Sequence, residues 1–215
     1  MKKIMMVLMV ILFVAAGNGQ SLKIGVGGGL MNFTAPAYFT DEYPKGIGFG
    51  MEPMINVKGK LGLPVFPLDL TASINYVMLG SEGKGNADPK TGVVNAHSVE
   101  ISGNLLQIGV GAEYSLIPGP LPVKPYVSFD ILLNNFGEMT YKYDWESNSI
   151  PDSELKSASL TRTGIAIGAG VDLKTPFADL NANVKYHINN LIGKEDGEDT
   201  ISSLSLGVMI LFSVL

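Results

Sequence analysis

The chain has 215 residues, of which 46% are hydrophobic and only 16% are charged, whereas about a quarter of the residues of an ordinary soluble domain are charged. With 15 Lys and Arg against 20 Asp and Glu, it has no basic excess to bind a phosphate backbone, so we expect no nucleic-acid partner. The absence of cysteine excludes disulfides, thiolate metal sites and cysteine nucleophiles, and we expect no metal and no cofactor.

The first twenty residues have the layout of a secretory signal peptide. Lys2 and Lys3 precede an apolar run over residues 4–14, and small residues follow it. That run is too short to span a bilayer comfortably, because a spanning helix needs about 20 residues. We therefore predict a signal peptide over residues 1–20, cleaved between Ala16 and Ser21, and a single domain over residues 21–215. An uncleaved N-terminal anchor helix is the alternative.

Eight segments of the remaining chain alternate between apolar and polar residues, which is typical of strands with two different faces. In the segment 68–78, for example, the even-numbered residues are apolar and most of the odd-numbered ones are polar. The predicted strands cover residues 22–34, 46–58, 68–78, 97–115, 127–134, 162–172, 181–189 and 203–212.

Two of these segments contain an irregularity. In the segment 97–115 the apolar residues are odd-numbered at Val99 and Ile101 but even-numbered from Leu106 onward, which predicts a β-bulge near residues 103–104. Pro53, inside the second segment, has no backbone N–H to donate. It therefore predicts either a bulge or an interruption of the ladder.

The alternation alone fits two all-β architectures, a soluble sandwich or lipocalin-like barrel and a membrane barrel with its apolar face toward lipid. The connections favour the second. Those after the second, fourth and sixth strands are short, at residues 62–67, 116–122 and 174–179. Those after the first, third, fifth and seventh strands are long and polar, at residues 35–45, 80–96, 137–159 and 190–199. We predict an eight-stranded antiparallel up-and-down transmembrane β-barrel with short periplasmic turns and long outer loops.

Four segments carry a resemblance to a known family, namely Gly109–Tyr114, Lys124–Asp130, Thr163–Asp172 and Asp179–His187. They resemble the outer-membrane β-barrel domain family, the small eight-stranded barrels that include OmpX and the transmembrane part of OmpA. The resemblance implies a monomer in the outer membrane of a Gram-negative bacterium, in contact with outer-membrane lipid and with the outer-membrane assembly machinery. One departure is the chain end, Phe212-Ser-Val-Leu215, where the family's assembly signal usually ends in an aromatic residue.

The polar strand faces predict what fills the barrel. Eight strands enclose just enough room for side chains, and charges confined there need partners or water. We predict an ion-pair network in the lumen, formed by Lys23, Glu52, Lys58, Lys60, Asp69, Glu113, Asp130, Arg162, Asp172 and Lys185. The alternative is a narrow passage for small solutes, including hydrophobic ones. Inward glycines would leave room for it, namely Gly25, Gly27, Gly29, Gly46, Gly48, Gly50, Gly168 and Gly170.

One segment suggests an enzyme and argues against it at the same time. Tyr186–Asn190 resembles the His-x-Ser-Asn segment of outer-membrane lipid A deacylases, which are also eight-stranded barrels, and His187 matches the base. The nucleophile position holds Asn189, which has no hydroxyl to deprotonate. We therefore predict that His187 lines the lumen and hydrogen-bonds its neighbours, and that the protein is not an enzyme.

The outer loops combine aromatic and acidic residues. Tyr141, Tyr143 and Trp145 predict an interfacial aromatic girdle at a strand end. The acidic residues of these loops predict solvated surface charge, and a Ca²⁺ or Mg²⁺ site is the alternative. These residues are Asp144, Glu146, Glu195, Asp196, Glu198 and Asp199. The sequence thus predicts a structural or surface-interaction role, in which a surface ligand is bound through the outer loops.

Overall fold

The computed structural model describes residues 21–63, 66–84, 98–117, 119, 121–145 and 153–214. The predicted signal peptide and its cleavage site at residues 16–21 lie almost wholly outside this range. None of the helices in the described part of the chain is long and apolar enough to cross a bilayer.

The described residues form ten strands and one short helix, α2 (Ala37–Thr40). The strands are β1 (Ser21–Ala35), β2 (Met51–Gly62), β3 (Leu68–Lys84), β4 (Ser98–Ser115), β5 (Val123–Phe136), β6 (Thr140–Asp144), β7 (Ser153–Lys156), β8 (Leu160–Lys174), β9 (Asp179–Ile192) and β10 (Ser202–Ser213).

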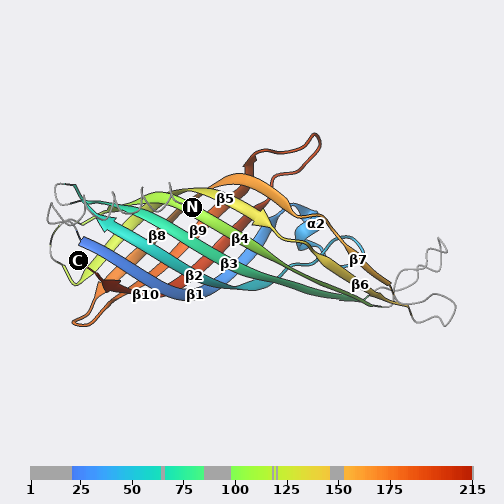
Figure 1. Ribbon diagram of the computed structural model, residues 1–215, viewed down its shortest axis with the longest axis horizontal. Coiled ribbons are helices and arrows are strands. Elements are labelled where there is room, and N and C mark those ends of the chain that lie inside the picture. Colours follow the sequence, from blue (N-terminus) through green and yellow to red (C-terminus); the bar gives the residue numbers. More distant parts are fainter. Residues whose placement is uncertain are drawn as a thin grey trace, which may run out of the picture.

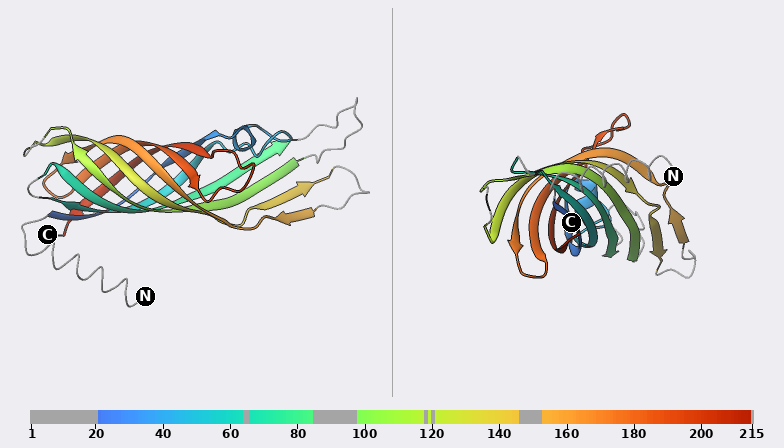
Figure 2. Two further views of the ribbon diagram at one scale, coloured as in Figure 1. Left: turned by 90° about the horizontal axis from the view of Figure 1, so that it is seen from above. Right: turned by 60° about the vertical axis from the view of Figure 1, so that its left-hand side comes forward.

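Eight of these strands close into an antiparallel barrel (Figures 1 and 2). Around the barrel they follow the order β3, β2, β1, β10, β9, β8, β5, β4, and the pairing of β3 with β4 closes the ring. Neighbours in the ring are also neighbours in the sequence, apart from the pairing of the first strand β1 with the last strand β10 and from the hairpin of β6 and β7 between β5 and β8. The predicted eight-stranded up-and-down barrel is therefore confirmed.

The connections alternate in length as predicted. The short ones span residues 63–67, 116–122 and 175–178, and the strand ends that they join lie at the end of the barrel where β1 begins and β10 ends (Figure 1). The strand ends joined by the long connections lie at the opposite end, which we call the loop end. At the loop end, β3 and β4 extend beyond the first residue of β2. Two further strands continue this sheet, because β6 pairs with β4 and β7 pairs with β6 (Figure 2). We call these four paired segments the outer extension.

The strand faces are apolar outside and mostly polar inside. On β2, Met51, Ile55 and Val57 are exposed on the outside, whereas Lys58 and Lys60 are buried inside. An exterior of this kind suits the hydrocarbon core of a bilayer, because lipid chains then cover the apolar side chains.

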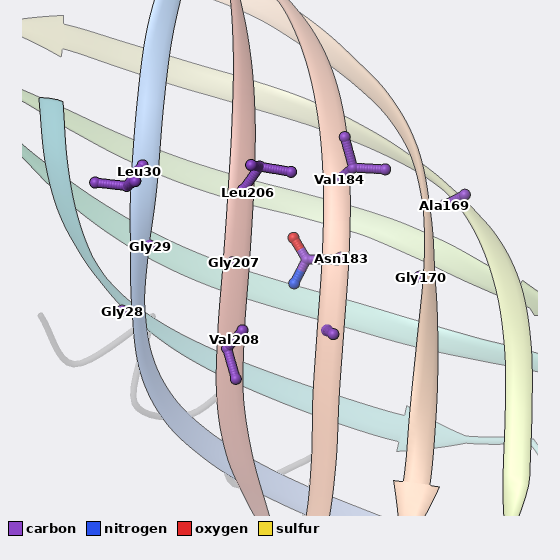
Figure 3. A pocket seen from close by; sticks show the side chains of 11 residues that line it. Gly28, Gly29, Leu30, Ala169, Gly170, Asn183, Val184, Leu206, Gly207 and Val208 are labelled. Atoms are coloured by element: carbon purple, nitrogen blue, oxygen red, sulfur yellow. The ribbon is translucent and has the colours of Figure 1, made fainter. Parts of the chain in front are cut away.

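Glycines on the inner face of β1 allow β10 to approach closely. A Cβ at Gly27 would lie 2.1 Å from the carbonyl oxygen of Val208 and 2.4 Å from the Cβ of Met209. Equivalent overlaps occur at Gly25 and Gly29, so these glycines leave no free room in the lumen. On the outside, the same region is hollowed where residues such as Gly28 carry no large side chain (Figure 3).

The second strand differs from the prediction at its start. β2 begins at Met51, and Ile47 and Phe49 precede it as buried members of an interior apolar cluster. They do not share the outer face of Met51, because the chain before β2 turns into the mouth of the barrel. Pro53 causes no bulge, since the β1–β2 register runs through it without a shift. It marks an interruption instead, because the ladder of β2 with β3 ends at Met54.

The predicted bulge near Gly103 and Asn104 is wrong. β4 pairs with β3 from Ser98 to Tyr114 without a register shift. The odd-numbered residues of β4 therefore face inward throughout, including the buried Val99 and Ile101. The apolar residues change parity because the interior itself becomes apolar toward the loop end.

Candidate functional site

The barrel interior is the place where the functional side chains converge, and its charged part lies toward the chain termini. Lys58 of β2 forms an ion pair with Glu113 of β4. The ammonium of Lys60 contacts Asp172 of β8 and lies 2.8 Å from Glu113 Oε2 and 3.1 Å from Asp69 Oδ2. These contacts join β2, β3, β4 and β8 across the lumen.

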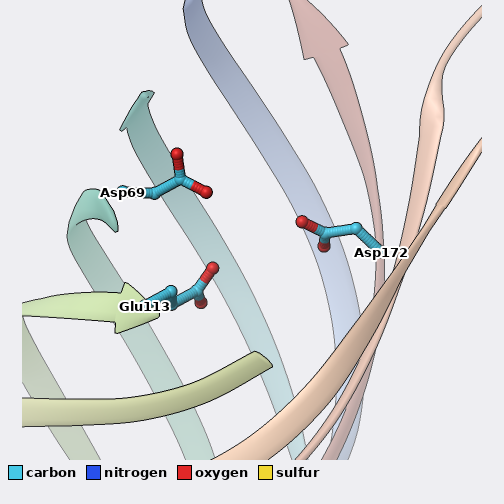
Figure 4. Close-up of side chains that lie close together, drawn as sticks. All are labelled: Asp69, Glu113 and Asp172. Atoms are coloured by element: carbon cyan, nitrogen blue, oxygen red, sulfur yellow. The ribbon is translucent and has the colours of Figure 1, made fainter. Parts of the chain in front are cut away.

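The three carboxylates around Lys60 have the spacing of a metal site but hold an ammonium group. One oxygen each of Asp69, Glu113 and Asp172 lies within 4.8 Å of the others (Figure 4). The Lys60 ammonium forms an ion pair with all three and donates a hydrogen bond to Asp172. The cluster is therefore an ion-pair cluster, in which the lysine occupies the place that a cation would take.

Tyr126 and Asn181 complete this cluster. The Tyr126 ring centroid lies 5.5 Å from the Lys58 ammonium and 5.1 Å from that of Lys60, within the range of cation–π attraction. Asn181 donates to the Tyr126 hydroxyl at 2.8 Å and to Asp172 Oδ1 at 2.6 Å. The buried charges are thus surrounded by further polar partners, which offsets part of their desolvation cost.

Two more ion pairs lie in the lumen. Lys185 of β9 contacts Asp130 of β5 at 2.6 Å. Lys23 of β1 pairs with Asp179 at the start of β9, so its partner lies outside the predicted set. Asp179 has the same parity as the inward residues of its strand, and extension of the predicted strand by one alternation would have found it.

Neutral side chains occupy the next level toward the loop end. Gln107 donates to Asn134 at 2.9 Å and to Asn189 at 3.1 Å, and Asn189 donates to Ser203 at 3.0 Å. All four side chains are fully buried. This amide layer joins β4, β5, β9 and β10 by hydrogen bonds.

An apolar cluster fills the interior at the loop end. The Phe33 ring lies 5.3 Å from that of Phe39 and 5.5 Å from that of Phe49, between ring centroids. Buried aliphatic residues such as Leu105 and Val77 belong to the same cluster. From the termini to the loop end, the interior of the barrel therefore changes from ion pairs to amides to apolar side chains.

Arg162 lies elsewhere than predicted. It is near the start of β8 at the loop end, and its Nε and Nη2 donate to Glu198 Oε2 at 3.0 and 2.7 Å. Its Nη2 also lies 3.2 Å from Glu195 Oε1. The parity of Arg162 is inward as expected, but its height along the barrel brings it to the loop between β9 and β10. These hydrogen bonds lower the pKa of Glu198 to about 2.

Glu52 is the second exception in the predicted network. Its carboxylate accepts hydrogen bonds from the backbone N–H groups of Gly50 at 3.1 Å and Gly80 at 3.0 Å. No ion pair joins it to a lysine or arginine among the described residues. Because the β2–β3 ladder ends at Met54, the Gly80 N–H has no ladder partner on β2, and the carboxylate takes that place.

The segment around His187 forms hydrogen bonds inside the lumen. His187 is 1% exposed, and its Nε2 lies 2.8 Å from the Ser205 hydroxyl on β10, a partner that the sequence did not indicate. Asn189 is fully buried and committed to the amide layer. Neither side chain is open to a substrate from outside the barrel.

A comparison with known protein families shows the family of this chain. Residues 4–212 match the model of the outer membrane protein beta-barrel domain. The chain belongs to this outer-membrane β-barrel family. Among curated proteins no relative matches it.

Solved structures share the fold of this barrel. Neisserial surface protein A is 18% identical, with a TM-score of 0.50 over 90% of this chain and 96% of that one. A major outer membrane protein from Thermus thermophilus is 14% identical, with a TM-score of 0.56 over 89% of this chain and 99% of that one. Membership of this family indicates a bacterial outer-membrane barrel.

The loop aromatics of this outer-membrane barrel are not a lipid-facing girdle. Tyr141, Tyr143 and Trp145 pack against the interior apolar cluster. The Tyr143 and Trp145 rings stack with centroids 6.3 Å apart. They point inward because β6 pairs with β4 beyond the barrel, so that their side chains lie on the same side of the sheet as the inner face of β4. Glu146, also predicted in these loops, lies outside the described residues.

Proposed function

We propose that this protein is an outer-membrane barrel of a Gram-negative bacterium with a structural or surface-interaction role, and that its lumen is closed. The observation that carries the proposal is the sequence of interior levels, from the ion pairs around Lys60 through the amides around Gln107 to the apolar cluster around Phe33. Side chains that fill the lumen in this way stabilise the barrel wall. The function of the protein then resides on its outer surface.

The outer extension is the surface that we assign to partners. Its outward side carries charged neighbours across adjacent strands, with Glu82 opposite Glu100, Glu100 opposite Lys142, and Lys142 opposite Glu154. Like charges directly opposite each other destabilise a strand pair, so Glu82 and Glu100 are not placed there by the needs of folding alone. A surface of this kind suits recognition of a partner outside the membrane.

The remaining surface fits lipid. The belt of exposed apolar side chains contacts outer-membrane lipid, and the barrel works as a monomer after insertion by the outer-membrane assembly machinery. No enzymatic role is proposed, because Asn189 is held in the amide layer and His187 is buried against Ser205.

Conductance across a planar bilayer tests the closed lumen. We expect no regular open-channel steps from the purified barrel. Regular steps of one size would overturn the closed lumen and support the alternative, a narrow channel for small or hydrophobic solutes. A porin reconstituted in the same bilayer serves as the positive control.

Cysteine labelling tests the orientation and the exposed role of the outer extension. The chain has no cysteine, so single variants can be labelled without background. With a membrane-impermeant maleimide on intact cells, we expect Lys142→Cys to react and Lys174→Cys to react only after the outer membrane is opened. The reverse pattern would contradict the proposed orientation.

A further inference from the structure

A polar hollow opens at the end of the barrel that carries the short turns and the chain termini. It has a volume of about 330 Å³, and its lining includes four lysines from β1, β2, β5 and β8, namely Lys23, Lys60, Lys124 and Lys174. Three aspartates line it as well. The hollow adjoins the buried ion-pair cluster, with which it shares Lys60, Asp69 and Asp172, and it takes no part in the proposed surface role.

The aspartates of the hollow are already engaged. Asp179 pairs with Lys23, and both Asp69 and Asp172 pair with Lys60. Asp172 also accepts a hydrogen bond from Asn181 at 2.6 Å. The register places Lys124 opposite Asp172 and Lys174 opposite Asp179, but neither carboxylate is bonded to its cross-strand lysine.

Lys124 and Lys174 therefore form no ion pair with a carboxylate among the described residues, and Asp69, which is paired with Lys60, attracts Lys124 without contacting it. The two ammonium groups lie near each other and repel. Four lysines against three aspartates leave one positive charge in excess in the lining. Two unpaired ammonium groups at one polar hollow are stabilised when a multivalent anion bridges them.

We propose that Lys124 and Lys174 form a phosphate-binding site at the turn end of the barrel. Phosphate offers several oxygen acceptors that two ammonium groups can share, and lysine is a common phosphate ligand. The same chemistry is presented by free phosphate in the periplasm and by the phosphate of a lipid headgroup in the inner leaflet. Ser21 and Ser213 also line the hollow, and a serine hydroxyl can donate to a bound anion.

Titration of the folded barrel with inorganic phosphate in a nonionic detergent tests the site, with binding followed by calorimetry. We expect saturable binding that weakens as sodium chloride is added, because the site is electrostatic. In the double variant Lys124→Gln/Lys174→Gln we expect affinity to fall by about tenfold or more, since two charge-assisted contacts are lost. Lys142→Gln/Lys156→Gln, on the outer extension, is the matched control and should bind as the wild type does.

Each outcome decides the proposal. No phosphate binding to the wild type overturns it, as does equal binding by the two double variants. If the double variant does not fold, the phosphate affinity of Lys174→Gln alone, at an exposed strand end, decides the proposal in the same way. Lys124→Arg keeps the positive charge and should retain phosphate binding. A soluble short-chain phosphatidic acid that competes with phosphate assigns the site to lipid headgroups as well, whereas a lack of competition restricts it to free phosphate. Conductance and surface labelling do not depend on this result.

Discussion

Arg162 near the start of β8 binds Glu198 in the loop between β9 and β10 through two donors, Nε at 3.0 Å and Nη2 at 2.7 Å from the same carboxylate oxygen. The side-chain amide of Asn190 also donates a hydrogen bond to Glu198, at 2.7 Å. This contact fixes the loop to the barrel rim. It directs the side chain of Arg162, the only arginine of the chain, toward this loop instead of into the central lumen.

The pH dependence of stability should reveal this loop contact. The pKa of Glu198 is lowered to about 2, chiefly by the hydrogen bonds from Arg162. A carboxyl with a lowered folded pKa stabilises the fold above its unfolded pKa of about 4.5, and that stabilisation is lost as the pH falls toward 2. We expect Glu198→Gln to lower the free energy of unfolding at pH 7, obtained from urea titration, by no more than about 1 kcal/mol because the pair is partly exposed.

The difference between Glu198→Gln and the wild type should shrink between pH 4.5 and pH 2, measured by tryptophan fluorescence in detergent. Glu154→Gln is the control, since Glu154 lies 3.9 Å from Lys156 on the exposed hairpin. A difference that stays constant down to pH 2 would contradict the assigned ionisation.

The buried pair Lys58–Glu113 should matter more than any pair on the outer extension. Both side chains are at most 3% exposed, so a charge left alone there is poorly solvated. We expect Glu113→Gln to cost about 3–5 kcal/mol of unfolding free energy, because Lys58 and Lys60 both lose a partner. Glu100→Gln, which removes an exposed pair with Lys142, should cost about 0–1 kcal/mol.

A second substitution distinguishes lost charge balance from a packing defect at that pair. Lys58→Met in the Glu113→Gln background removes the uncompensated ammonium, so part of the lost stability should return. Urea midpoints of all four proteins in the same detergent provide the measurement. Equal losses for Glu113→Gln and Glu100→Gln would show that the lumen is well hydrated.

Gly27 and Gly28 provide a test of the close contact between β1 and β10. A Cβ at Gly27 would overlap the backbone of β10 at 2.1 Å, whereas a Cβ at Gly28 would meet only the Met54 carbonyl oxygen at 3.4 Å. We expect Gly27→Ala to be destabilised by about 1–3 kcal/mol, as overpacked interiors are, and Gly28→Ala to fold normally. Heat-modifiable migration on gels reports the folded fraction, and equal behaviour of these neighbours would refute the contact.

The strand pattern predicted the fold well because a period of two specifies which face each residue occupies. It did not specify height along the barrel, and height decides which charges meet. Lys23 reaches Asp179 two strands away, and Arg162 reaches a loop, although both have the predicted inward parity. Parity also failed at Ile47 and Val99, where apolar residues face an apolar interior instead of lipid.

The site was predicted in its residue types but only partly in its contacts. Lys58, Lys60, Asp69, Glu113 and Asp172 meet in one cluster, and Lys185 meets Asp130. Glu52 departs from the set because a broken ladder, which the sequence marks only by Pro53, offers its carboxylate backbone donors. Lys124 has inward parity too, but the predicted strand began three residues after it, at residue 127.

Leu105 and Leu206 distinguish an interior packed by protein from an exterior covered by lipid. Leu105 of β4 is fully buried in the apolar cluster, and Leu206 of β10 is 52% exposed on the outside. Leu105→Ala leaves a cavity that the rigid barrel cannot close, so we expect a loss of about 2–5 kcal/mol. Leu206→Ala loses only transfer free energy, about 0.8 kcal/mol for each methylene, because acyl chains move into the space. Urea midpoints in lipid vesicles compare the same substitution at both sites. A larger loss of stability for Leu206→Ala than for Leu105→Ala would mean that the loop-end interior is not tightly packed.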